Sequence, residues 1–247
     1  MGASMSASPS DSPLSSPYGR AVAHPAFPVL FPALLWLAFT PLLAIHPLAV
    51  YVVYPIQVFA VLIALGFQAS RLGVPLAGSG AGVFRPMFSF GAGLLAFAAW
   101  AVVQTVWPMP PHGLALPGNV GEPFNPYYIF GAGAVARGEA AFRLLGAGIV
   151  LPLVAEMAIR GWLMRRLIAR DFLSVPLASF TPFSFLASTV AFALFRPTAC
   201  GPEIAAALIL GIWFLASRNF AGVLLASIVC HLLAALDAVT AAKWVLW

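Results

Sequence analysis

The chain has 247 residues, of which 62% are hydrophobic and only 8% are charged, and its mean hydropathy is +0.98. So few polar side chains cannot cover a soluble globule of this size, and the composition therefore predicts an integral membrane protein. The basic excess, 12 Lys and Arg against 7 Asp and Glu, comes mostly from arginines that flank apolar segments. This distribution is typical of membrane topology and argues against a nucleic-acid partner.

The chain divides into a polar start and one long apolar region. Residues 1–25 begin with a Ser/Pro-rich stretch without any apolar run, and we expect this segment to be a disordered cytoplasmic tail. It does not resemble a signal peptide, because the apolar segment that follows is long enough to span and no cleavage site comes after it. We expect residues 26–247 to form a single transmembrane domain without an internal repeat.

Apolar segments predict the helices. A spanning helix needs about 20 mainly apolar residues, and we expect an all-α fold, a polytopic transmembrane helical bundle of about 7–8 spanning helices. The tail from Thr240 is the candidate for a partial eighth helix. The seven clear candidates are residues 27–45, 48–69, 87–106, 140–168, 183–195, 204–216 and 220–239.

Arginines predict the orientation, because short cytoplasmic loops carry the positive excess. The connections after the second, fourth and sixth segments fall on one side of the membrane in this assignment. This places the amino terminus in the cytoplasm and the Pro-rich connection 107–139 outside. The arginines concerned are Arg71, Arg85, Arg165, Arg166, Arg170 and Arg218.

Two charges lie inside the fourth apolar segment. Glu156 and Arg160 are one helical turn apart, so their side chains share a face and can form an ion pair in the favourable Glu-before-Arg order. Ionisable groups at membrane depth persist mainly where they face a protein interior or a wet cavity, so the pair marks a candidate site. The alternative is a structural ion pair that holds two helices together.

Two further polar residues are candidates for the same site. His231 is the only histidine within a predicted span, and its nearest acid along the helix, Asp237, does not share its face. A hydrogen-bonded packing histidine is the alternative. Arg196 ends the fifth segment on the predicted outer side, where positive charge is not enriched. We therefore expect an internal partner for Arg196, with Glu156 as the candidate, although an arginine that extends to the membrane interface needs no partner.

These residues resemble a known family in their order and spacing. The stretch from Arg143 to Arg165, the segment from Asp171 to Leu177, Phe192 to Arg196, and His231 are similar to the CAAX-protease and bacteriocin-processing family. The core of the resemblance is at about residues 140–240. More narrowly, the arrangement resembles the CAAX-prenyl-protease-related proteins of bacterial exosortase protein-sorting loci, which implies a multi-pass protein of the bacterial inner (plasma) membrane.

The family pattern is Glu-Glu-x-x-x-Arg, Phe-x-x-x-His and His-x-x-x-Asn or Asp, and the resemblance implies an intramembrane endopeptidase in which a glutamate and a histidine activate water. The three motifs here read Ala155-Glu156-x-x-x-Arg160, Phe192-x-x-x-Arg196 and His231-x-x-x-Ala235. Loss of the general base alone slows such reactions by about 10²–10⁴. Arginine cannot replace histidine as a proton acceptor, although it can donate to an oxyanion.

Two hypotheses follow from this incomplete match. In the first, the chain is a membrane endopeptidase with weakened activity that processes a membrane-anchored protein or peptide, with Glu156 as base, His231 and Arg196 as oxyanion donors, and Arg160 and Phe192 as structural or substrate-positioning residues. In the second, the chain has lost catalysis and is a binding or escort component of an envelope protein-sorting system. A small transporter is a third class, but it would need paired broken helices, which we do not find.

We expect neither a metal nor another cofactor. Glu156 and His231 fall short of the three protein ligands that a catalytic zinc site usually has. Arg196, if it lies beside them, would repel a cation. From the composition and the family resemblance, the partners that we expect are the lipid bilayer, a membrane-associated protein or peptide, and protein-sorting machinery.

Overall fold

The computed structural model describes residues 23–46, 48–68, 84–106, 125–196 and 199–243. In these ranges the regular structure is helical throughout and contains no strand, so the predicted all-α bundle is confirmed. Most of the tail predicted to be disordered, residues 1–25, lies outside the described residues.

Within the described residues, five helices are long and apolar enough to cross a membrane: Ala49–Gln68, Pro86–Val106, Ala134–Arg166, Cys200–Ser217 and Phe220–Thr240. Two shorter apolar helices, Phe27–Leu43 and Pro182–Ala193, account for the first and fifth predicted segments. The chain is thus a multi-pass membrane protein. The tail beyond Thr240, predicted as a partial eighth helix, lies mostly outside the described residues.

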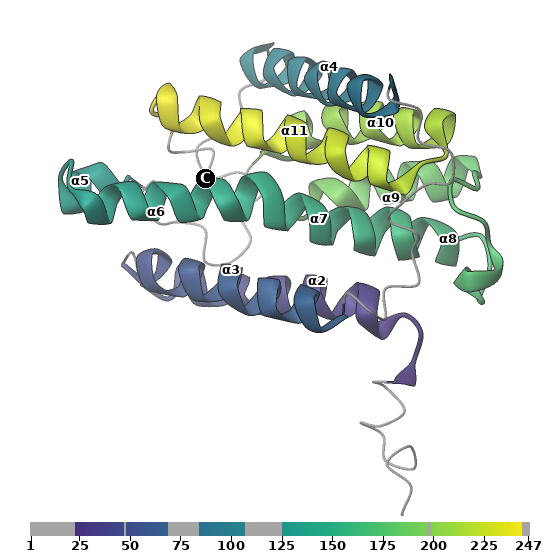
Figure 1. Cartoon of the computed structure of the whole chain (residues 1–247), viewed down its shortest axis with the longest axis horizontal. Coiled ribbons are helices and arrows are strands. Elements are labelled where there is room, and N and C mark those ends of the chain that lie inside the picture. Colours follow the sequence, from purple (N-terminus) through teal and green to yellow (C-terminus); the bar gives the residue numbers. More distant parts are fainter. Residues whose placement is uncertain (1–22, 47, 69–83, 107–124, 197–198, 244–247) are drawn as a thin grey trace, which may run out of the picture.

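The helices lie roughly parallel to one another in stacked layers (Figure 1). One layer holds α2 and α3, the next holds the chain from α6 to α8, and α11, α10, α9 and α4 complete the bundle. The elements are α2 (Phe27–Phe39), η3 (Thr40–Ala44), α3 (Ala49–Gln68), α4 (Phe84–Val106), α5 (Pro126–Phe130), α6 (Ala134–Leu145), η5 (Gly146–Val150), α7 (Leu151–Glu156), η6 (Met157–Leu163), α8 (Met164–Arg166), η7 (Phe172–Ser174), α9 (Pro182–Ala193), α10 (Cys200–Ser217) and α11 (Phe220–Thr240).

The elements from α6 to α8 form one continuous central helix across the middle of the bundle (Figure 1). Two stretches of this helix, η5 and η6, are π-helical, with hydrogen bonds that reach five residues back. They flank α7, which carries Pro152 near its start and Glu156 at its end. Because proline has no N–H to donate, Pro152 leaves the backbone oxygen of Gly148, in η5, without its usual helical donor.

Helix α11 packs between α4 and the central helix, and two glycines allow that close approach. A Cβ atom at Gly93 of α4 would lie only 2.6 Å from the carbonyl oxygen of Ala226 in α11. A Cβ atom at Gly148 of η5 would lie 2.9 Å from a methyl carbon of Leu232, also in α11. Since α11 carries His231, these two contacts fix how deep the imidazole sits in the bundle.

Local signals in the sequence set the helix ends near the site. Thr181 and Ser184 form a capping box at the start of α9, and the side chain of Asn219 accepts a hydrogen bond from the N–H of Gly222 at the start of α11. Arg218 adopts a left-handed conformation with φ of 49° and joins α10 to α11 in a tight turn. The two helices therefore run antiparallel, so the start of α10 lies beside the later part of α11.

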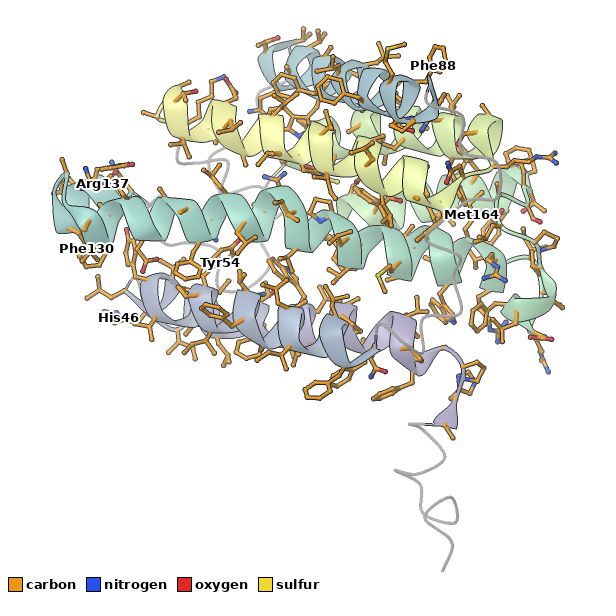
Figure 2. All side chains as sticks on the ribbon, in the orientation of Figure 1. His46, Tyr54, Phe88, Phe130, Arg137 and Met164 are labelled. Carbon is orange, nitrogen blue, oxygen red and sulfur yellow. The ribbon has the colours of Figure 1, made fainter. Side chains whose placement is uncertain are left out.

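Side chains separate into a lipid-facing and a buried set. Phe88 at the start of α4 is exposed and points away from the bundle (Figure 2), as do many large apolar residues of α3 and α4. Tyr54 of α3 is buried and points toward the central helix (Figure 2), where its ring lies 4.3 Å from the guanidinium carbon of Arg143. The interior thus contains polar groups, and those nearest α7, α10 and α11 form the candidate site.

Candidate functional site

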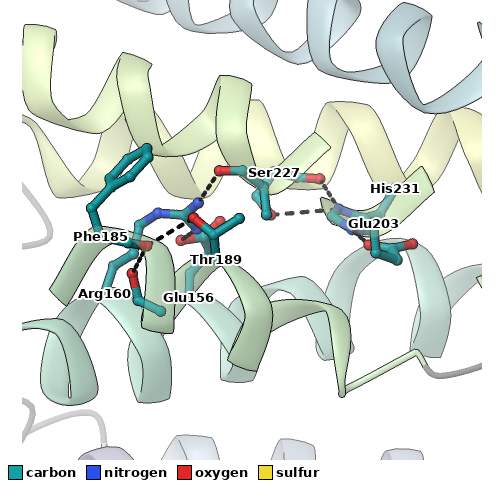
Figure 3. Close-up of polar contacts among 9 residues, drawn as sticks. Glu156, Arg160, Phe185, Thr189, Glu203, Ser227 and His231 are labelled. Atoms are coloured by element: carbon teal, nitrogen blue, oxygen red, sulfur yellow. Dashed lines mark hydrogen bonds and ion pairs between the residues drawn. The ribbon is translucent and has the colours of Figure 1, made fainter. Parts of the chain in front are cut away.

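Glu156 and Arg160 form the ion pair that their spacing predicts. The Arg160 guanidinium donates to one oxygen, Oε2, of the Glu156 carboxylate, and both side chains are buried (Figure 3). The second guanidinium nitrogen of Arg160 donates to the backbone oxygen of Ala207 in α10 at 2.8 Å. Arg160 therefore links the central helix to α10 and holds the carboxylate in one orientation.

The other carboxylate oxygen of Glu156, Oε1, is buried and has no hydrogen-bond partner among the described residues. A buried carboxylate oxygen without a donor is unusual, because desolvation is then uncompensated. Within the described part of the chain, this atom is thus an acceptor available to a water molecule or to a donor on a ligand. No comparable acceptor exists on the second buried glutamate of the site, Glu203, whose two oxygens both have partners.

Glu203 was not among the residues that the sequence singled out, yet it is the most connected polar group of the site. It lies in the first turn of α10 and is completely buried. Its Oε1 accepts a hydrogen bond from the indole nitrogen of Trp100 at 3.2 Å, and its Oε2 lies 2.9 Å from Nε2 of His231. A glutamate directly after proline at the start of an apolar helix is a recognisable signal of a helix start.

The expected pairing of Arg196 with Glu156 is wrong, because Arg196 pairs with Glu203. Its Nη1 atom lies 3.1 Å from Oε1 of Glu203, an ion pair without hydrogen-bond geometry. The physical reason is connectivity. Arg196 lies three residues after the end of α9 and Glu203 lies in the first turn of α10, so the two are close in the sequence, whereas Glu156 already has Arg160 as its counter-charge.

Both ring nitrogens of His231 are engaged (Figure 3). Nδ1 lies 2.7 Å from the backbone oxygen of Ser227, one turn earlier in α11, and Nε2 meets Glu203. Asp237 is not involved, since its carboxylate pairs with Lys243 at 2.8 Å near the end of α11. The imidazole is therefore held in place by one carbonyl and one carboxylate.

The ring of Phe192, on α9, contacts both Arg160 and His231. The guanidinium carbon of Arg160 is 5.2 Å from the centre of its ring, and the imidazole of His231 is 5.7 Å from it, centroid to centroid. The site thus consists of two charged clusters joined by one aromatic ring. The first cluster is Glu156 with Arg160, and the second is Glu203 with Arg196, His231 and Trp100.

The two alanines at motif positions are part of the apolar packing. Ala155 is buried and belongs to a small cluster with Ile159, Phe192 and Ala207. Ala235 is fully buried in α11. Where the family pattern has a glutamate and an amide or acid, the described structure therefore has packed methyl groups.

No group of three His, Cys, Asp or Glu side chains that could hold a metal ion occurs in the described ranges. The polar groups that are present are two carboxylates, two guanidinium groups, an imidazole and an indole N–H. Together they can accept a proton from water, donate to an oxyanion and hold a ligand by charge.

Comparison with known proteins gives one match. Residues 137–236 match the family described as "Type II CAAX prenyl endopeptidase Rce1-like". No curated protein and no solved structure matches the chain. The matched region contains every residue of both charged clusters except Trp100, and it confirms the predicted relation to the CAAX-protease family.

Proposed function

We propose that this member of the CAAX-protease and bacteriocin-processing family, whose Rce1-like domain spans residues 137–236, cleaves membrane-associated proteins or peptides at the Glu156 site. The family supports a membrane endopeptidase in general. The assignment of individual residues is our proposal, with Glu156 as general base and His231 and Arg196 as the groups that stabilise the oxyanion. Arg160 and Phe192 hold the base and the imidazole in position.

The observation that carries the proposal is the free oxygen of Glu156. In the reaction, Oε1 accepts a proton from a water molecule as the water oxygen attacks the peptide carbonyl carbon. The carbonyl oxygen becomes an oxyanion, and the proton on Glu156 is then transferred to the departing amine as the C–N bond breaks. No covalent intermediate with the protein is needed, and Arg160 fixes the orientation of the carboxylate throughout.

Arg196 and His231 are the charged or polar groups that could stabilise the oxyanion. A guanidinium group has five N–H donors, and the contact of Arg196 with Glu203 engages only one of its nitrogens in an ion pair. A preorganised donor aimed at an oxyanion accelerates such reactions by about 10²–10³. Burial of both side chains strengthens this effect, because charge interactions are larger where water is excluded.

The test is hydrolysis of lipid-anchored, fluorescence-quenched peptides by the purified full chain in detergent micelles. Glu156→Gln keeps the shape of the side chain but cannot accept the proton, and we expect kcat/KM to fall by about 10²–10⁴. Glu139→Gln is the matched control, because Glu139 lies on the same continuous helix outside both clusters. Unchanged hydrolysis by a folded Glu156→Gln protein would refute the assignment of the base.

A second candidate function is a catalytically inactive binding or escort component of an envelope protein-sorting system. The packed methyl groups of Ala155 and Ala235 favour it, as does the engagement of His231 and Arg196 by Glu203. In a strain that lacks the protein, Glu156→Gln should then restore function as well as the natural sequence does. Loss of function in a stably expressed Glu156→Gln protein would contradict this candidate.

We also propose a location in a bacterial inner membrane with the amino terminus in the cytoplasm. Helix α8, which carries Arg165 and Arg166, and the turn from α10 to α11, which carries Arg218, lie at the end of the bundle where α2 begins (Figure 1). Support comes from contacts at that end, where Val29 of α2 and Phe220 of α11 both approach Gly161. Labelling of single cysteines introduced at position 166 and position 137 in intact cells and in inverted vesicles tests the orientation.

A further inference from the structure

The contacts of His231 determine which of its two ring nitrogens carry a hydrogen. Nδ1 of His231 lies 2.7 Å from the backbone oxygen of Ser227, and a carbonyl oxygen can only accept. Nδ1 must therefore carry a hydrogen and donate it. The hydroxyl of Ser227, at 3.5 Å from the same nitrogen, is too distant to compete with the carbonyl.

A neutral imidazole with its hydrogen on Nδ1 has a lone pair on Nε2. That lone pair would face Oε2 of Glu203 at 2.9 Å, and an ionised carboxylate oxygen also presents only lone pairs. Two lone pairs at this separation repel each other, so the contact requires one hydrogen between the two atoms. Either the imidazole carries hydrogens on both nitrogens, or the carboxyl group of Glu203 carries one.

The surroundings of Glu203 favour the first arrangement. Arg196 lies 3.1 Å from Oε1, and the indole N–H of Trp100 donates to the same oxygen. The carboxylate also lies in the first turn of α10, where the helix dipole presents positive charge. All three stabilise a negative charge on Glu203, so the shared hydrogen belongs on Nε2 of His231.

The other charged groups near the imidazole do not supply an alternative partner. Glu156 and Arg160 compensate each other as an ion pair, and the ring of Phe192 contacts both Arg160 and His231. Cys230, the neighbour of His231 in α11, is a buried free thiol. Glu203 is therefore the carboxylate that determines the hydrogens on the imidazole.

We propose that Glu203 is a positioning residue that holds His231 as a doubly protonated, positively charged imidazole, which donates one hydrogen to Ser227 and the other to Glu203. The family pattern has a histidine at the end of its second motif and an amide or acid at the end of its third, and Arg196 and Ala235 stand at those positions here. Glu203, a carboxylate of α10, thus orients His231 and keeps it positively charged. His231 is the one histidine of the family motifs that this chain retains. The catalytic consequence rests on the proposed function, but the arrangement of hydrogens does not.

The experiment measures the ring nitrogens of His231 directly by nuclear magnetic resonance. The full chain is labelled with ¹⁵N-histidine in lipid nanodiscs at neutral pH, after replacement of His24, His46 and His112 by glutamine so that one histidine remains. We expect both ring nitrogens of His231 to show the chemical shifts of protonated nitrogens. One unprotonated nitrogen in this otherwise natural chain would overturn the proposal, and that measurement needs no variant at Glu203.

The variant Glu203→Gln then tests whether Glu203 is the reason that both ring nitrogens of His231 carry a hydrogen. The glutamine amide can donate to Nε2, so the imidazole becomes neutral, with hydrogen on Nδ1 only, and we expect the Nε2 signal to move to the position of an unprotonated nitrogen. Glu203→Asp should restore part of the doubly protonated signal, and Glu139→Gln should leave it unchanged. An unchanged signal in a folded Glu203→Gln protein would also overturn the proposal.

Hydrolysis assays separate this proposal from the proposed function. If the chain is an endopeptidase, Glu203→Gln should lower kcat more than it raises KM, because the substrate does not contact Glu203 directly. If Glu156→Gln has no effect on hydrolysis but Glu203→Gln changes the His231 signal, the proposed base is wrong and the role of Glu203 stands. If the reverse holds, Glu156 is the base and Glu203 does not set the state of His231.

Discussion

The guanidinium carbon of Arg160 lies 5.2 Å from the centre of the Phe192 ring, which places a buried cation against an aromatic face inside the bundle. The same ring contacts the imidazole of His231 on α11. Phe192 therefore packs against a member of each charged cluster. A cation over a ring is stabilised by about 2 kcal/mol when water is excluded.

Replacement of Phe192 by leucine should remove that stabilisation while keeping an apolar side chain. We expect Phe192→Leu to lower the free energy of unfolding by about 2 kcal/mol. Thermal unfolding of the purified protein in detergent measures the effect. The matched control is Phe183→Leu, since Phe183 lies on the same helix but is 67% exposed. Equal midpoints for the two variants would contradict a special role of the ring.

The buried ion pair between Glu156 and Arg160 should behave as a unit. Arg160→Met leaves the carboxylate without its counter-charge, and the expected loss of stability is about 3–5 kcal/mol. The double variant Glu156→Leu with Arg160→Met removes both charges and should recover most of that loss. Chemical unfolding of the single and double variants measures the coupling, and losses that simply add would argue against an ion pair in the folded protein.

The close approach of α4 and α11 predicts a strong effect at Gly93. A methyl group there would meet the backbone oxygen of Ala226 at 2.6 Å, and a backbone atom cannot move aside cheaply. We expect Gly93→Ala to lower the unfolding midpoint clearly and to shift α11 with His231. Gly91→Ala is the control on the same helix, because a methyl group at Gly91 meets nothing within 4 Å. Alanine at that position should be neutral or should stabilise the helix by up to about 1 kcal/mol.

Arg165 should hold the connection between α8 and α9. Its guanidinium donates to the backbone oxygens of Val175 at 2.7 Å and of Leu173 and Gly161 at 3.3 Å, and it lies over the ring of Phe172. We expect Arg165→Ala to release this connection, so that trypsin cleaves faster after Arg170. Arg166→Ala is the neighbouring control, since Arg166 is exposed. Equal cleavage rates in both variants would show that Arg165 does not restrain the connection.

The sequence was sufficient to predict those features of the fold and site that depend on local spacing. Long apolar runs predicted the helical membrane bundle, and four-residue spacing predicted the ion pair of Glu156 with Arg160. Both depend on a single helix and its periodicity. The π-helical stretches beside Pro152 could not be read in this way, because an extra residue per turn leaves no mark in an almost uniformly apolar segment.

Contacts between helices are harder to predict from the sequence than contacts within one helix. The sixth predicted segment begins at residue 204, one position after Glu203, which places the glutamate outside the predicted helix. Glu156 is then the acid predicted to lie deepest inside a span, and it becomes the expected partner of Arg196. The pairing of Glu203 with His231 joins residues 28 positions apart, and it depends on the tight turn at Arg218 that folds α11 back on α10.

Glu156 and Glu203 differ in the stage of synthesis at which each carboxylate can first pair with a positive charge. Glu156 and Arg160 belong to one helix, so they can neutralise each other as soon as that helix forms. Glu203 depends on Arg196 before it and on His231 in the following helix. Because an isolated carboxylate enters lipid unfavourably, α10 is expected to enter the bilayer together with the preceding Arg196 and with α11, which completes the cluster. The distribution of charges along the chain therefore sets an order for its own insertion into the bilayer.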